Sequence, residues 1–261
     1  MSAKSKSVPR TPSESSQMRL KAIICQVLTR EAALAVSRSR HEVDVEVLPI
    51  SLHHTGDAMR SALQERIDAA DADGYDAVVL GYALCGRGTE GLRAGKTPLV
   101  MPRAHDCIDI LMGGHSKSMA YFETRPGEYY CSPGWVEFLN ASSGMQPAAA
   151  TNVFGDRRPL EELIAKYGEV HGRYLYENFG ASGGRDPGLT YISTGVSGED
   201  QLRGKARNRA EAEHKEFSEC QGTTEVLERL LTGNWAAEEF LFVPPGSSVR
   251  AVLGASIVDL S

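Results

Sequence analysis

The stretch at residues 76–86, DAVVLGYALCG, decides the fold class. It is an almost unbroken apolar run that ends at a cysteine and a glycine. Such a run is typical of a strand that is buried on both faces of a parallel sheet. A sheet of this kind needs helices on both faces to cover it. The stretch therefore predicts an α/β protein.

The segments around residues 76–86 supply the rest of this sheet. Three further strand candidates lie at residues 19–26, 42–50 and 97–102. The second of them, EVDVEVLPI, alternates charged and β-branched residues as a half-exposed edge strand does. Residues 54–76 carry a helical apolar stripe, and residues 89–95 (TEGLRAG) predict a short helix. The order predicts a doubly wound, mainly parallel sheet flanked by helices, a three-layer sandwich.

The remainder of the chain is expected to belong to the same domain. Further helix candidates lie at residues 116–125, 159–167, 198–217 and 223–233, and strand candidates at 188–194 and 238–244. Residues 1–18, rich in Ser, Lys and Pro, are expected to form a disordered polar tail. Residues 19–261 are then a single α/β domain. Its core is 19–145, and the looser second half, 146–261, completes the sheet.

Composition excludes several classes of function. A net charge of −6 argues against a protein that binds nucleic acid through a basic face. No apolar run approaches the roughly 20 residues of a membrane span, so we expect a cytoplasmic protein with no membrane partner. Five cysteines are too few for a disulfide framework, which predicts reduced thiols. Cys131 could approach the sheet edge discussed next, whereas Cys220 has no evident role.

Three cysteines fall at the carboxyl ends of predicted strands. Cys25 ends the first strand, Cys85 follows the third, and Cys107 comes shortly after the fourth. In a flavodoxin-like strand order these three strands are neighbours, and ligands bind at their carboxyl ends. Three thiols there suit an open Zn²⁺ site with His105, water or substrate in the fourth position, or an iron–sulfur cluster. The alternative is three inert core side chains, since free cysteine is often buried.

Other polar residues are expected at the same edge. His53 and His54 follow the second strand, and one of them, for which His54 is our candidate, could be a ligand or a general base. Arg103 could anchor the carboxylate or phosphate of a substrate, or form a surface salt bridge. Asp106 could orient a ligand, or cap the helix that follows it.

Five sequence blocks, in this order, resemble one known family: IICQVLTRE, VLPISLHHT, YDAVVLGYALCGRGTEGL, PLVMPRAHDCIDILMG and EYYCSPGW. They are similar to the bacterial and archaeal family catalogued as domain of unknown function sixteen thirty-eight. The resemblance implies that Cys25, Cys85 and Cys107 recur, together with His105 and a histidine at 53–54. Members are often encoded near corrinoid proteins and methyltetrahydrofolate-type methyltransferases, which implies one-carbon or methyl-transfer metabolism.

Together these observations lead us to expect a metal-dependent enzyme, with Cys25, Cys85 and Cys107 as metal ligands. Zn²⁺ is favoured, because a zinc site can hold a substrate thiol as thiolate at neutral pH. His54, His105 and Arg103 are the catalytic candidates, and the substrate is a small anionic or thiol compound. Two alternatives remain open. One is a non-catalytic metal, corrinoid or small-molecule binding partner of a corrinoid methyltransferase system, and the other is an iron–sulfur protein that uses the same cysteines.

Overall fold

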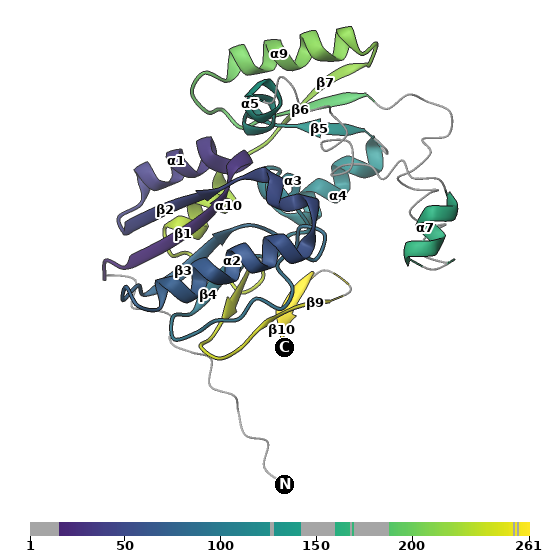
Figure 1. Cartoon of the computed structure of the whole chain (residues 1–261). Coiled ribbons are helices and arrows are strands. Elements are labelled where there is room, and N and C mark those ends of the chain that lie inside the picture. Colours follow the sequence, from purple (N-terminus) through teal and green to yellow (C-terminus); the bar gives the residue numbers. More distant parts are fainter. Residues whose placement is uncertain are drawn as a thin grey trace.

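Five strands form the largest sheet of the computed structural model, which describes residues 16–125, 128–141, 160–167, 169, 188–252, 254 and 256–261. Their order is β2-β1-β3-β4-β8 (Figure 1). The strands are β1 (Arg19–Cys25), β2 (Glu42–Leu48), β3 (Ala77–Gly81), β4 (Leu99–Pro102) and β8 (Phe240–Val243). The first four pair in parallel, and β8 runs antiparallel to β4. The predicted α/β class and the adjacency of β1, β3 and β4 are confirmed.

Helices cover both faces of this sheet, as Figure 1 shows. On one side α1 (Thr29–Arg38) packs against α10 (Glu225–Leu231), and on the other lies α2 (Gly56–Ala70). The predicted stripe of α2 is buried, namely Met59, Leu63, Ile67 and Ala70. Short 3₁₀ helices follow β1 and β2, at η1 (Gln26–Leu28) and η2 (Ile50–His54). The central sheet is therefore flanked by helices, as the apolar run of β3 predicts.

The helix predicted at residues 89–95 is wrong. This segment forms turns, and its backbone pairs with the end of the chain instead of with itself. The Gly91 amide donates to the carbonyl of Val249 (2.8 Å), and the Ala94 amide donates to that of Ser247 (3.0 Å). Two short antiparallel strands lie there, β9 (Val249–Ala251) and β10 (Val258–Leu260). Donors that are used in this way cannot close the hydrogen bonds of a helix.

A second, smaller sheet lies beyond the first. Its three parallel strands are β5 (Tyr129–Cys131), β6 (Leu189–Ser193) and β7 (Phe217–Gln221). The helices near it are α4 (His115–Thr124), α5 (Pro133–Ala141) and α9 (Glu199–Ala212), and α7 (Leu160–Tyr167) follows α5 in the chain. The helix predicted to reach residue 217 ends at Ala212, because residues 217–221 form β7. In the second half of the chain, β8 is the only strand among the described residues that joins the large sheet.

The two sheets are joined through the first turns of α1 and α5. The Arg30 side chain donates to Glu137 of α5 and to the Ser197 carbonyl, both at 2.6 Å. The Thr194 hydroxyl, just after β6, donates to the carboxylate of Glu31 at 2.8 Å. Glu31 is fully buried, and its second carboxylate oxygen has no partner among the described residues.

This burial raises the pKa of Glu31, with the hydrogen bond from Thr194 opposing the shift. The folded chain therefore favours the protonated acid, and this contribution to stability is lost as pH rises through the raised pKa. As pH rises above the ordinary range of a carboxyl group, we expect Glu31→Gln to gain stability relative to the natural chain by on the order of 1 kcal/mol, measured by urea unfolding. Glu137→Gln should lose stability relative to it, because Arg30 lowers the pKa of Glu137. If the difference in stability between Glu31→Gln and the natural chain did not change with pH, the raised pKa of Glu31 would be contradicted.

Candidate functional site

Three thiols meet at the carboxyl edge of the large sheet. Cys25 is the last residue of β1, Cys85 lies in the turn after β3, and Cys107 begins α3 (Cys107–Leu111). The β3–β4 pairing continues into the following segments, since the Cys85 amide donates to the His105 carbonyl at 2.8 Å. The Leu84 amide likewise donates to a carbonyl after β4, at 3.0 Å. We call these three residues the thiol cluster.

The three thiols lie near enough to one another to influence their ionisation. Burial raises the pKa of Cys25 to about 12. The pKa values of Cys85 and Cys107 are raised first by burial and then by neighbouring negative charge, that of a Cys25 thiolate included. All three are therefore protonated at neutral pH. Cys131 and Cys220 lie on the smaller sheet, on β5 and β7, and are not part of the cluster.

A tyrosine that the sequence did not single out lies against the cluster. Tyr82 is buried, and its hydroxyl is next to the Cys25 sulfur with no nitrogen or oxygen partner in the described part of the chain. The His53 ring stacks on Tyr82 with the ring centroids 5.9 Å apart. The Nδ1 of His53 lies 3.1 Å from the Ile50 carbonyl, which only accepts, so Nδ1 carries a proton. The side chain of His54 lies outside the described residues.

The start of α5 covers the thiol cluster. The Trp135 indole lies beside Cys107, where it opposes the rise in the pKa of this thiol. Gly134 approaches η1 so closely that a Cβ atom there would lie 2.1 Å from the Val27 carbonyl oxygen. Only glycine permits this contact. The smaller sheet thus contributes one wall of the site.

The turn that carries Cys85 has a rare backbone conformation. Cys85, Gly86 and Arg87 follow one another with φ of 48°, 62° and 70°. Side chains with a Cβ seldom adopt such angles, and surrounding contacts must hold them there. A run of this kind is found most often at functional sites.

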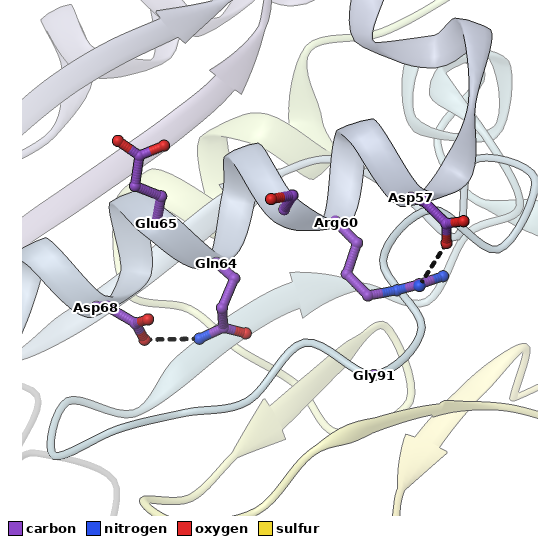
Figure 2. A pocket seen from close by; sticks show the side chains of 7 residues that line it. Asp57, Arg60, Gln64, Glu65, Asp68 and Gly91 are labelled. Carbon is purple, nitrogen blue, oxygen red and sulfur yellow. Dashed lines mark hydrogen bonds and ion pairs between the residues drawn. The ribbon is translucent and has the colours of Figure 1, made fainter.

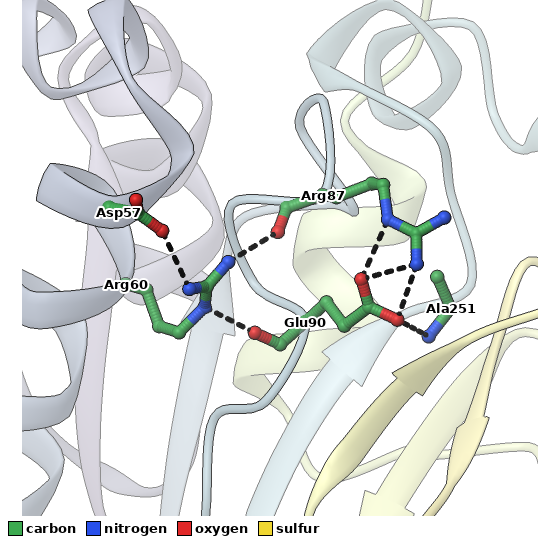
Figure 3. A network of polar contacts seen from close by, with 5 residues as sticks. All are labelled: Asp57, Arg60, Arg87, Glu90 and Ala251. Carbon is green, nitrogen blue, oxygen red and sulfur yellow. Dashed lines mark hydrogen bonds and ion pairs between the residues drawn. The ribbon is translucent and has the colours of Figure 1, made fainter. Parts of the chain in front are cut away.

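Figure 3 shows the contacts that hold this turn. Arg60 of α2 donates to the carbonyls of Arg87 and Glu90 while it pairs with Asp57 at 2.8 Å. The Glu90 carboxylate in turn binds the Arg87 guanidinium and accepts from the Ala251 amide at 3.2 Å. The turn is therefore fixed between α2 and the C-terminal strands.

Arg103 holds a different part of the fold. Its guanidinium donates to the carbonyls of Ala237 (2.9 Å), Ser256 (3.3 Å) and Val258. These bonds fasten the C-terminal strands to the end of β4. They give Arg103 a structural role, and its role as an anion anchor stays a prediction.

His105 and Asp106 lie between the thiol cluster and α4. Asp106 caps α3 as predicted, since its carboxylate accepts from the Ile108 amide at 2.9 Å and from the Asp109 amide at 3.3 Å. Burial and then the charge of Asp109 raise the pKa of Asp106 to about 6. His105 is exposed, partial desolvation lowers its pKa, and its ring lies edge-on to that of His115, with 4.6 Å between centroids.

Comparison with known proteins identifies the family. The family described as a protein of unknown function (DUF1638) matches residues 47–231, which is more than half of the chain. The chain belongs to the DUF1638 family. The DUF1638 match contains Cys85 and Cys107, whereas β1 and Cys25 precede it. No curated protein and no solved structure matches the chain.

Two further observations bear on what this DUF1638 protein can bind. In the residues that the structure describes, no group of three or more His, Cys, Asp or Glu side chains is arranged to hold a metal ion. Likewise, no helix within the described ranges is long and apolar enough to cross a membrane.

An open depression of about 580 Å³ lies on the outer face of α2 (Figure 2). It is lined by Asp57, Arg60, Ser61, Gln64, Glu65, Asp68 and Gly91. Its side chains largely bind one another, as Gln64 binds Asp68 at 2.7 Å. None of the three thiols lines it, so the chemistry of the site lies elsewhere.

Proposed function

We propose that this protein is a metal-dependent enzyme of one-carbon or methyl-transfer metabolism and that its thiol cluster holds the metal. The observation that carries the proposal is the meeting of Cys25, Cys85 and Cys107 from the ends of three neighbouring strands. Soft sulfur donors favour Zn²⁺ or an iron–sulfur cluster over hard cations such as Mg²⁺. Zn²⁺ is our first choice, because three thiolates leave its fourth position open.

The three cysteines suit such an ion by the chemistry of their sulfur atoms, and binding needs a local change in their arrangement. As described, the thiols are protonated and not arranged around a common centre. Rotation about the Cα–Cβ bonds moves a sulfur without moving the backbone, and we propose that binding uses such rotations. The Tyr82 hydroxyl, which lacks an oxygen or nitrogen partner among the described residues, marks the polar centre of the cluster.

The role of the metal would be to bind a substrate thiol and lower its pKa, so that a thiolate nucleophile exists at neutral pH. The methyl-transfer setting comes from the family resemblance, and the substrate is a small anionic or thiol compound. His105 and His54 are the candidates that the sequence offers for moving its proton.

The closed form of the site favours a second candidate. Trp135 and Gly134 of α5 cover the cluster, whereas a catalytic metal site keeps a position open to substrate. A non-catalytic binding partner of a corrinoid methyltransferase system would accept a closed site. Stable co-purification with a corrinoid protein, without methyl transfer by this chain alone, would favour it.

Metal analysis with a visible spectrum tests the proposal. Protein purified with and without oxygen is expected to carry about one metal equivalent per chain, colourless for Zn²⁺ and brown for an iron–sulfur cluster. Cys85→Ser should lower this content to below about half an equivalent, because only two thiolates remain. The matched control is Cys220→Ser, a thiol on β7 away from the cluster, which should keep the full content. Equal metal content in both variants would reject the proposal.

A further inference from the structure

A buried carboxylate next to the thiol cluster collects three hydrogen bonds. Asp109 lies on α3 and is 2% exposed. One of its oxygens accepts from the His105 amide at 2.8 Å and from Nδ1 of His115 at 3.1 Å. The other accepts from the Ser118 hydroxyl. Within the described ranges, the partners that bind this carboxylate are thus all hydrogen-bond donors, and none is a lysine or arginine.

The chain turns sharply to make this contact. Gly113 and Gly114 have φ of 87° and 115°, which residues with a Cβ rarely adopt. The Gly114 amide donates to the Asp109 carbonyl at 2.7 Å and closes the turn. His115 then begins α4, and Ser118 follows one helical turn later, on the same side. Two glycines and a helix start thus hold one histidine against one carboxylate.

This contact fixes the tautomer of His115. A carboxylate only accepts, so Nδ1 of the neutral ring must carry the proton and Nε2 keeps its lone pair. The side chain of His115 is one quarter exposed, so that a small molecule can reach it. The same orientation of an imidazole by a carboxylate serves general bases in many enzymes.

The pair lies close to the thiols. Cys107 and Asp109 share α3, and the charge of Asp106 acts on Cys85 and Cys107. His115 acts in turn on Asp106, where it opposes the effects of burial and of Asp109. The charge of Asp106 thus influences the thiols and is itself influenced by His115, and the short helix α3 links Cys107 to the carboxylate that His115 contacts.

We propose that His115 is the general base of the site and that Asp109 is its positioning residue. This inference rests on the proposed function, in which a small thiol is the substrate. The S–H bond of the substrate breaks, its electron pair stays on sulfur, and its proton forms an N–H bond with Nε2 of His115. The Asp109 carboxylate balances the charge of the imidazolium that results. The sulfur is then a thiolate nucleophile, and no oxidant or reductant is consumed.

Two measurements test the pair itself. Nitrogen NMR of the histidine rings in the natural chain should show His115 protonated at Nδ1. Diethyl pyrocarbonate, which modifies unprotonated imidazole nitrogens, should react with His115 faster than with exposed His214, as peptide mapping measures. Asp109→Asn should slow the reaction at His115 at least about fivefold, because the amide can donate to Nδ1 and move the proton to Nε2. Thr124→Ala, on the same helix but with its hydroxyl on the Tyr121 carbonyl, should react as the natural chain does.

A third measurement places the pair at the substrate site. Zn²⁺-loaded protein with 2-mercaptoethanol as the thiol probe should protect His115 from the reagent. An Nε2-protonated ring in the natural chain, or a rate no higher than that of His214, would overturn the inference. If 2-mercaptoethanol did not slow the reaction of His115 with the reagent on metal-loaded protein, the inference would be overturned while the proposed function stands. If the chain did not load metal, the proposed function would be overturned. Even then, a fast reaction of His115 with diethyl pyrocarbonate that is slowed by Asp109→Asn would support the orientation of His115 by Asp109.

Discussion

Gly134→Ala is expected to lower the free energy of unfolding by roughly 3 kcal/mol. The added Cβ would lie 2.1 Å from the carbonyl oxygen of Val27 and 2.6 Å from its carbonyl carbon. These are backbone atoms of η1 and cannot rotate away as a flexible side chain can. The start of α5 must therefore move from the large sheet, and the Trp135 indole loses its contact with Cys107. Urea unfolding followed by circular dichroism measures the loss.

Gly204→Ala is the matched control. Gly204 lies within α9, and a Cβ there would meet nothing within 4 Å. Alanine in a helix interior is favoured over glycine, so this variant should gain about 1 kcal/mol. If the two alanine variants had the same stability, the close contact between α5 and η1 would not exist in solution.

Zn²⁺ binding is expected to release about three protons per ion near neutral pH. The free thiols are protonated because burial raises their pKa values, to about 12 for Cys25 and well above the ordinary value for Cys107. Each must lose its proton to bind as thiolate. Affinity should therefore rise with pH, by about a thousandfold per unit, and continue to rise past the usual thiol pKa of about 8.5. Competition with a chromophoric chelator at several pH values measures the slope.

Variants with one thiol fewer sharpen this test. Cys85→Ser should reduce the slope to about a hundredfold per pH unit, since two thiolates remain. Cys220→Ser should leave it unchanged, because this cysteine lies on β7. A slope of tenfold or less in the natural chain would mean that the cluster does not bind the ion through three thiolates.

The large sheet could be predicted from the sequence because its signals are local. The sequence of β3 is an unbroken apolar run because both faces of this strand are buried. The sequence of α2 shows an apolar stripe because only one face of this helix is buried. The rule for parallel connections predicted that the strands before Cys25, Cys85 and Cys107 are neighbours, and the strand order confirms this. The place of the three cysteines at one edge of the sheet thus needed no information beyond the order of the strands.

Other features depend on partners distant in the chain and left no local signal. Residues 89–95 look helical because nothing in them shows that residues 247–249 will take their hydrogen bonds. The strand β7 (FSECQ) is short and polar and follows a charged helix, so its sequence does not stand out as a strand. Tyr82 stands inside an apolar run, where nothing marks its hydroxyl group. His115 and Asp109 could have been suspected from the pair of glycines before His115, which marks a sharp turn back toward α3.

The pairing of β4 with β8 has a consequence for how the protein folds. β8 and the strands after it lie near the end of the chain, yet β8 completes the sheet next to β4, and Ala251 supplies a bond to Glu90 beside the Cys85 turn. During synthesis these contacts form only after residues 240–251 have emerged. Pairings so far apart in sequence form slowly. The turn that carries Cys85 should thus be among the last parts to gain protection from hydrogen exchange during refolding, after β1, β2 and β3 have already paired.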